Sequence, residues 1–205
     1  MKVKNLAILS ILTLTLLTGC SDKEKIDQNV VANNNQKQEK EVVQKPAKKH
    51  EAPKFDLKTV DGKTISIIAN NNGWQFQGLE NKVVLLDFFA TWCPPCRAEI
   101  PHLVNLKNEF KGKFEVIGLN IGERDGSITP NSVLQDFKKQ FNINYPIAAG
   151  QSVGALYHAL GNLNESNSIP FMLIFNTKGE FLQSYIGLVD EAMLNTIITN
   201  ALKSK

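Results

Sequence analysis

Apolar and polar positions follow two different patterns in the middle of the chain. Residues 83–89 and 114–121 are apolar runs of strand length rich in Val, Ile, Leu and Phe, which is typical of strands buried on both faces of a sheet. Between them, apolar residues recur at helical spacing from Ala98 to Phe110, and Gly112 ends the pattern. This order of strand, helix and strand predicts a crossover unit with two parallel strands.

Shorter patterns predict further elements on both sides of this unit. Two alternating segments flank the turn signal Asp61-Gly62 and predict a β-hairpin. The Asn-rich segment 69–82 is expected to be mostly a loop, in which Trp74 packs against the core. The later segments predict a helix at 132–141, a short strand at 144–147, a helix at 153–160, a hairpin at 171–186 and a last helix capped by Asp190.

The beginning of the chain has the pattern of an export signal. Two lysines precede an apolar stretch, residues 6–17, that is too short to span a membrane comfortably. The sequence LTGC at residues 17–20 resembles the bacterial lipobox, where a signal peptidase cuts before a cysteine that is then lipid-modified. We therefore expect a lipoprotein signal peptide at residues 1–19 and a lipid on Cys20. The alternative is an ordinary signal peptide with a cysteine near its cleavage site by chance.

The composition of residues 20–52 cannot supply a core. Asp, Glu, Lys, Asn and Gln dominate this segment, so it is expected to be a disordered, lipidated tether ahead of a domain at residues 53–205. The formal net charge of the whole chain is only +3, which does not favour nucleic acid as a partner. A domain of this length is expected to fold around one core, as a monomer.

Cys93 and Cys96 stand at Cys-x-x-Cys spacing, the pattern of a redox site. Cys93 lies at the start of the predicted helix, where free backbone N–H groups and the helix dipole favour a thiolate. Cys93 is therefore the expected nucleophile, and Cys96 the thiol that resolves a mixed disulfide. The alternative, a zinc site, needs more cysteines or histidines at ligand spacing. The only other cysteine is Cys20 and the three histidines are scattered, so no metal is expected.

A longer motif surrounds the two cysteines. The sequence Trp-Cys-Pro-Pro-Cys begins at Trp92, Glu99 and Pro101 follow it, and Ile169-Pro170 precedes a later apolar run. On these residues the chain resembles the TlpA/ResA-like branch of the thioredoxin superfamily, which includes the CcmG-type proteins of cytochrome c maturation. The resemblance implies an α/β, thioredoxin-like fold with an N-terminal β-hairpin and a central α/β insertion.

The resemblance also implies where a substrate binds. It places a cis peptide bond before Pro170, opposite the cysteines, and leaves the backbone of Ile169 free to pair with an extended substrate segment. Pro94 and Pro95 lack backbone donors and stiffen the link between the two sulfurs. The residues expected to contact substrate are Trp92, Pro94, Pro95, Ile169 and Pro170.

Two carboxyl groups are the expected proton carriers. Asp87 lies inside the first apolar run, where burial raises the pKa of a carboxyl group, and it matches an Asp that takes the proton of the second cysteine in thioredoxins. The alternative is that Asp87 only satisfies a backbone amide. Glu99, one helical turn after Cys96, matches a characteristic glutamate of the resembled branch, whose members more often have a neutral residue in place of Asp87. Thioredoxins often carry a lysine where this chain has Gly118, so Asp87 lacks that cationic partner.

Together these features predict an extracytoplasmic thiol–disulfide oxidoreductase that acts mainly as a reductant of protein disulfides, with no cofactor besides the Cys93–Cys96 disulfide. A lipid anchor would hold it in the periplasm or on the outer face of the cell membrane. Because cytosolic reductases do not reach that compartment, a membrane electron-transfer protein of the DsbD/CcdA type is expected to re-reduce it. The resemblance implies apocytochrome c or copper-site proteins as clients. A thiol oxidase or isomerase of the same fold, or a copper-handling chaperone, are the alternatives.

Overall fold

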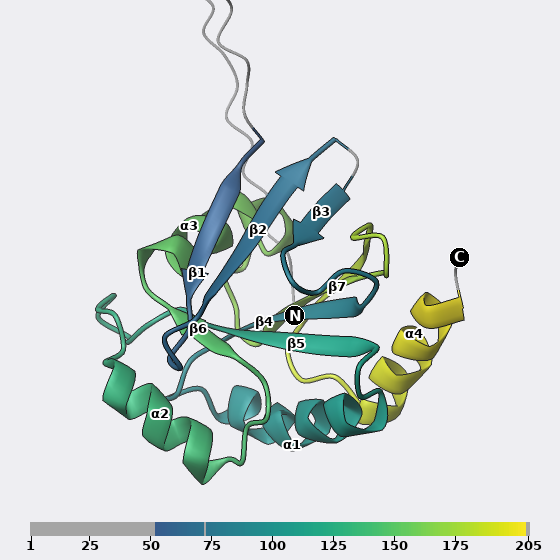
Figure 1. The fold of residues 1–205 in the computed structure, drawn as a ribbon. Coiled ribbons are helices and arrows are strands. Elements are labelled where there is room, and N and C mark those ends of the chain that lie inside the picture. Colours follow the sequence, from purple (N-terminus) through teal and green to yellow (C-terminus); the bar gives the residue numbers. More distant parts are fainter. Residues whose placement is uncertain (1–51, 72, 204–205) are drawn as a thin grey trace, which may run out of the picture. The chain divides into compact units, whose positions relative to one another are not determined.

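The structure, a computed structural model, describes residues 52–71 and 73–203. These residues form a five-stranded sheet and a separate three-stranded sheet, with helices packed on the larger one (Figure 1). The expected signal peptide, the cysteine at position 20 and the tether up to residue 51 lie outside the described residues.

The five-stranded sheet carries the cysteine segment at one end of its central strand. Its order is β6-β5-β4-β7-β8. The central strand β4 (Val83–Phe89) runs parallel to β5 (Phe114–Asn120) and antiparallel to β7 (Phe171–Phe175), while β6 (Ile147–Ala149) and β8 (Phe181–Ile186) are the edges. Every residue of β4 is buried, which confirms the prediction of a strand covered on both faces. The crossover unit and the last hairpin are confirmed as well, whereas the short strand lies slightly later than predicted.

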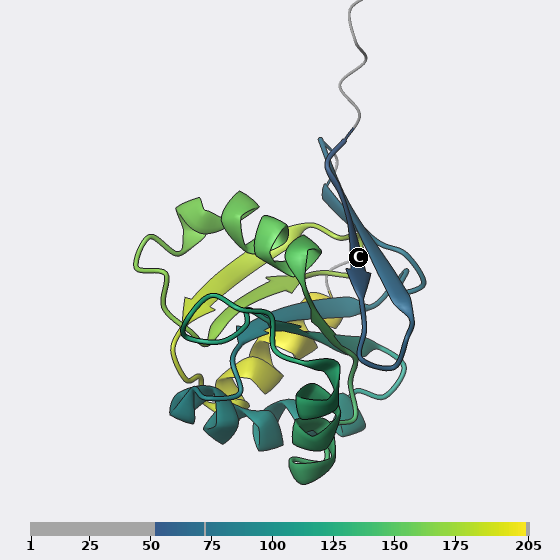
Figure 2. The ribbon, with the colours of Figure 1, turned by 90° about the vertical axis from the view of Figure 1, so that its left-hand side faces the viewer.

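Helices cover both faces of this sheet (Figures 1 and 2). On one face lie α1 (Pro94–Glu109), α2 (Asn131–Gln140) and α4 (Glu191–Lys203). On the other face lies α3 (Gln151–Ala159), followed by a 3₁₀ turn (Gly161–Leu163). The segment α2-β6-α3 between β5 and β7 is the central insertion that the resemblance implied.

The alternating side chains of β4 divide the core into two clusters. Its odd-numbered residues, Asp87 among them, point to the face covered by α1, α2 and α4, which we call the α1 face. Its even-numbered residues point to the face covered by α3 and the three-stranded sheet, which we call the α3 face. A carboxyl group therefore lies among apolar side chains on the α1 face.

The three-stranded sheet packs on the α3 face and consists of β1 (Lys54–Lys58), β2 (Thr64–Asn70) and β3 (Gly73–Phe76). The first two strands are the predicted hairpin.

The prediction of a loop at 69–82 is wrong in its first half, because Trp74 and Phe76 alternate with polar positions as in a strand. As expected for Trp74, both rings pack on the core, with centroids 5.6 and 5.1 Å from that of Phe175. The backbone N–H of Trp74 also donates to the carbonyl of Gly179 at 2.8 Å. The two backbone segments lie so close together there that no side chain would fit at position 179.

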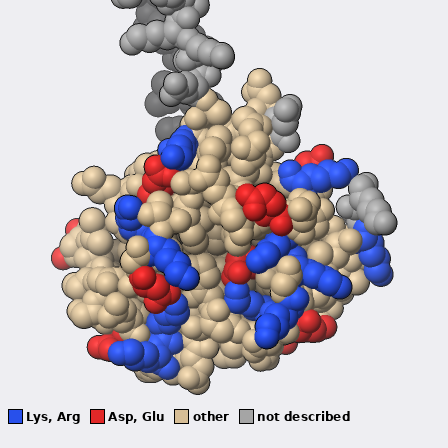
Figure 3. Space-filling view, viewed as in Figure 1, with Lys and Arg blue, Asp and Glu red and all other residues tan. Residues whose placement is uncertain are grey.

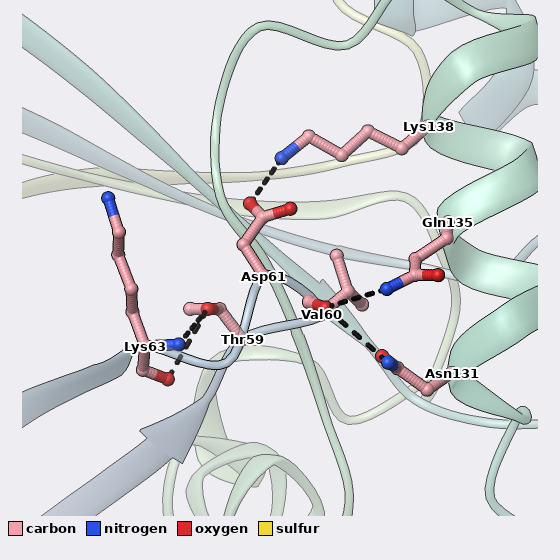
Figure 4. A network of polar contacts seen from close by, with 7 residues as sticks. All are labelled: Thr59, Val60, Asp61, Lys63, Asn131, Gln135 and Lys138. Carbon is pink, nitrogen blue, oxygen red and sulfur yellow. Dashed lines mark hydrogen bonds and ion pairs between the residues drawn. The ribbon is translucent and has the colours of Figure 1, made fainter.

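The turn between β1 and β2 is joined to the central insertion (Figure 4). Two side-chain amides of α2 donate to the carbonyl of Val60, that of Gln135 at 3.1 Å and that of Asn131 at 3.4 Å. Lys138 pairs with Asp61 at 2.5 Å in a partly exposed position. These contacts fix the orientation of α2, and through it the insertion, relative to the N-terminal hairpin.

Charged side chains of both signs are mixed on the face shown in Figure 3. No large area of one sign is visible on this face, which agrees with the small net charge of the chain. Among the described residues, no helix combines the length and the apolar character needed to cross a membrane.

Candidate active site around the Cys93–Cys96 disulfide

Cys93 and Cys96 form a disulfide at the N-terminus of α1, with their Cα atoms 5.3 Å apart. Cys93 caps the helix: its sulfur accepts the backbone N–H of Cys96 at 3.3 Å. Pro94 and Pro95 occupy the first helical positions, where backbone N–H groups have no partner inside a helix in any case. The remaining free N–H groups and the helix dipole favour a thiolate on Cys93 after reduction. Both cysteines are only 2 % exposed, so in the disulfide form Cys96 is no more shielded than Cys93.

The segment before β7 lies opposite this disulfide. The Ile169-Pro170 peptide bond is cis, as the resemblance implied. The carbonyl oxygen of Ile169 is 3.8 Å from the sulfur of Cys93. Pro170 is buried and its carbonyl accepts the N–H of Gly187 at 2.8 Å, whereas Ile169 is partly exposed. The structure thus brings the two halves of the sequence motif together, with Ile169 at the surface beside Cys93.

Trp92, directly before Cys93, is held by the loop that follows β5. Its indole N–H donates to the carbonyl of Gly122 at 3.0 Å. The guanidinium of Arg124 lies over the indole ring, 4.2 Å from its centroid, in a cation–π contact. Trp92 is partly exposed and the two prolines between the cysteines are exposed, so these residues form the accessible rim of the site.

Asp87 of β4 and Glu99, three residues after Cys96 on α1, form a buried acidic pair. They are only 3 % and 1 % exposed. Burial raises the pKa of Asp87 to about 7. Burial and, after it, the charge of Asp87 raise the pKa of Glu99 to about 9, against the opposing effect of the Val189 N–H, which donates to Glu99 at 3.4 Å. At neutral pH the pair therefore retains at least one proton.

The acidic pair has unused hydrogen-bonding capacity. One oxygen of Asp87 and one of Glu99 are buried without a hydrogen-bond partner among the described residues. No hydrogen bond links Asp87 to a described backbone amide, so the alternative role considered for it has no support in the structure. Buried polar atoms without partners are rare and often belong to functional sites. A proton, a water or a thiol could occupy these positions.

Gly118 stands opposite Asp87 in the pairing of β4 and β5. A Cβ atom at 118 would lie 3.2 Å from the rings of both Phe89 and Tyr145. The buried ring of Tyr145 therefore takes the space beside Asp87 that a side chain at 118 would need. Burial raises the pKa of Tyr145, and so do the charges of Asp87 and Glu99. The missing cation was anticipated from the sequence, but Tyr145 was not, because its position depends on the insertion folding back onto β5.

Arg124 and Gly122 are also site residues that the sequence did not reveal. Thirty residues separate Gly122 from Trp92, and no local pattern links them. One signal was available: the chain has only two arginines, Arg97 and Arg124, among its 23 basic residues. The described residues contain no group of three or more His, Cys, Asp or Glu side chains that could hold a metal ion.

A disulfide at a helix N-terminus, a cis proline opposite it and a central sheet of this order define a thioredoxin-like thiol–disulfide oxidoreductase. The chain belongs to the AhpC/TSA family, which it matches over residues 49–184. A thiol:disulfide interchange protein of the thioredoxin family from Chlorobium tepidum TLS has a similar crystal structure. It gives a TM-score of 0.59 at 27% identity, over 74% of this chain and 95% of that one.

Other relatives agree with this class. StoA from Bacillus subtilis superposes with a TM-score of 0.52 at 25% identity, over 71% of this chain and 96% of its own. The thiol-disulfide oxidoreductase ResA from Bacillus subtilis is 25% identical over 146 residues, which cover 71% of this chain and 70% of ResA. The thioredoxin-like protein YneN of the same organism is 29% identical over 138 residues, 67% of this chain and 70% of YneN. These similarities confirm the resemblance to the TlpA/ResA-like branch, together with its fold and its class of activity.

Proposed function

We propose that the protein is a membrane-anchored, extracytoplasmic reductant of protein disulfides, in which Cys93 attacks the client and Cys96 resolves the intermediate. The observation that carries this proposal is the position of the Cys93 sulfur, at the N-terminus of α1 and 3.8 Å from the carbonyl of Ile169. An extended client segment that pairs with the backbone of Ile169 would bring its disulfide to that sulfur.

The two cysteines act in sequence. In the reduced protein, the thiolate of Cys93 attacks one sulfur of the client disulfide, that S–S bond breaks, and the other client sulfur leaves as a thiolate that takes up a proton. Cys96 then loses its proton and attacks the sulfur of Cys93, which releases the second client thiolate. The client gains two electrons, and the protein is left with the Cys93–Cys96 disulfide of the structure.

The acidic pair handles the proton of Cys96. At neutral pH the pair retains at least one proton, and where Asp87 is ionised it can accept a second proton while Cys96 becomes a nucleophile. The buried oxygen of Asp87 that lacks a partner is the site that receives it, directly or through a water. The same proton is then available to the departing client thiolate.

The N-terminal part of the chain supplies the location. Residues 1–19 are the signal peptide, Cys20 carries the lipid, and residues 20–52 are the tether of the domain at 53–205. This arrangement would hold the site near a membrane protein of the DsbD/CcdA type that returns electrons to the disulfide. By resemblance, the clients are apocytochrome c or copper-site proteins.

A trapping experiment tests the order of attack. We expect the full-length Cys96→Ala variant to accumulate mixed disulfides through Cys93, visible as client-linked species on non-reducing gels of cell envelopes. The double variant Cys93→Ser/Cys96→Ala is the matched control and should trap nothing. Equal trapping by Cys93→Ala, with Cys96 intact, would contradict the assigned order.

A redox equilibrium with glutathione tests the direction. We expect a reduction potential of roughly −270 mV, as in reducing thioredoxins. A value near the −120 mV of strongly oxidising relatives would exclude the role of a reductant.

The lipid anchor has a test of its own. In cells, Cys20→Ala should move the protein from the membrane fraction to the soluble fraction. Retention of this variant in the membrane would contradict the lipid anchor.

A further inference from the structure

Arg124 lies at the rim of the site without an ionic partner. Its guanidinium stacks on Trp92, next to Cys93, and its side chain is exposed. Among the described residues it takes part in none of the ion pairs. A guanidinium has five N–H donors in its plane, and an arginine that lies over an aromatic ring can still use them to bind a further group.

The loop that carries Arg124 keeps its own acidic residues occupied. One oxygen of Glu123 accepts the hydroxyl of Thr129 at 2.6 Å. One oxygen of Asp125 accepts both the N–H of Ser127 at 2.9 Å and its hydroxyl at 2.6 Å. Each of these carboxylates thus has one oxygen bonded within the loop, and neither forms an ion pair with Arg124 in the part of the chain that the structure describes. Their charges weaken the field around Arg124, so it can hold an anion by direct contact better than it can attract one from a distance.

The choice of arginine at this position is informative. Only two of the 23 basic residues of the chain are arginines, and both border the disulfide: Arg97 directly follows Cys96, and Arg124 stacks beside Cys93. A lysine would supply the same charge. Only arginine offers a planar fork that binds a carboxylate through two parallel hydrogen bonds while its face rests on an aromatic ring.

We propose that Arg124 binds a carboxylate of the client, namely an Asp or Glu side chain close to the reacting cysteine. This inference rests on the proposed function, since it places the client segment along Ile169 and beside Trp92. The loop of Arg124 also forms one wall of a cavity of about 290 Å³ that gives room to neighbouring client residues. Among the described residues, no charged side chain lines this cavity.

Matched disulfide peptides test this proposal. The reduced protein is mixed with two peptides of equal length that carry either Glu or Gln next to the reacting cysteine, and the rate of disulfide exchange is measured at several salt concentrations. We expect the Glu peptide to react about three to ten times faster at low salt, with an advantage that shrinks as salt is added. Arg124→Gln should reduce this ratio to about one, and Arg124→Lys should retain part of it.

Two controls separate this role from others. Lys111→Gln removes an exposed cation beyond the far end of α1 and should leave the ratio unchanged. The reduction potential of Arg124→Gln should equal that of the wild type, because the carboxylate contact belongs to the client.

Several results would overturn the inference. The inference fails if the wild type reduces the Glu and Gln peptides at the same rate. It also fails if Arg124→Gln slows both peptides equally, as loss of support for Trp92 would. A ratio that falls in Arg97→Gln but persists in Arg124→Gln would assign the carboxylate to the other arginine. A wild type that reduces neither peptide would remove the proposed function itself, a result distinct from reduction without preference.

Discussion

The two faces of the central sheet are built from the same strands and differ in what they bury. On the α3 face, Phe88 of β4 lies flat on Phe171 of β7 with ring centroids 5.6 Å apart, and Tyr157 of α3 completes the group at 5.2 Å from Phe88. On the α1 face, β4 and α1 contribute Asp87 and Glu99, and each has one buried carboxyl oxygen without a hydrogen-bond partner among the described residues. One face is an apolar packing surface, and the other holds ionisable groups at a cost in stability.

This difference assigns stability and chemistry to opposite sides of one strand. Successive residues of β4 point to opposite faces, so Asp87 and Phe88 are neighbours in sequence but belong to separate environments. Aromatic packing on the α3 face can hold the strand in place, while the α1 face keeps carboxyl groups away from the water that would solvate them. Substitution of Phe88 and substitution of Asp87 should therefore act in opposite directions on the free energy of unfolding.

The largest effect is expected on the aromatic face. Phe88→Ala removes a ring that is fully buried and contacts two other rings, so it should lower the free energy of unfolding by about 3–5 kcal/mol in urea denaturation. Leu182→Ala, at a position 41% exposed on the edge strand, is the control and should change it by less than about 1 kcal/mol. The reduction potential of folded Phe88→Ala should stay at the wild-type value. A shifted potential would show that the two faces are not independent.

An effect of opposite sign is expected for Asp87. Carboxyl groups titrate near pH 4 in an unfolded chain, so a pKa of about 7 for Asp87 means that the folded state binds more protons between these values. The free energy of unfolding therefore falls as the pH rises from about 4 to about 7, and Glu99 extends the fall to about 9. Asp87→Asn removes the contribution of Asp87 and should raise the free energy of unfolding by on the order of 2–4 kcal/mol at pH 8, with little change at pH 4.

Urea denaturation of the disulfide form at both pH values measures this difference. Asp136→Asn replaces an exposed acid of α2 and should alter stability little at either pH. A destabilisation by Asp87→Asn that is equal at pH 4 and pH 8 would mean that packing, rather than ionisation, governs this position.

The smallest effect is expected at the start of α4, the helix that reaches the acidic pair through Val189. Asp190 accepts the N–H groups of Ala192 and Met193 at 2.9 and 3.3 Å, so Asp190→Ala should lower the free energy of unfolding by about 1 kcal/mol. Met193→Ala shortens a half-exposed side chain in the same turn and is the control. Equal losses in the two variants would argue against the cap as the source.

Local patterns were sufficient to predict most of the fold and the two cysteines. Apolar runs located β4 and β5, and Asp61-Gly62 located the first hairpin, because these signals depend on neighbouring residues. The pairing of Ile169-Pro170 with the cysteines came from the resemblance. Tyr145 and Arg124 could not be predicted, because each reaches the site from a different part of the chain through tertiary packing. The strand β3 was missed because its few residues follow an Asn-rich segment that is typical of loops.

Gly118 limits which substitutions the site around Asp87 can accept. A lysine introduced there alone would meet the rings of Phe89 and Tyr145, which stand 3.2 Å from where its first side-chain carbon must go. A smaller residue in place of Tyr145 alone would leave a void against the acidic pair. The ring of Phe89 would remain 3.2 Å from that carbon, so a side chain at 118 requires both rings to shift by a few tenths of an ångström. The space beside Asp87 is thus set jointly by Phe89, Gly118 and Tyr145.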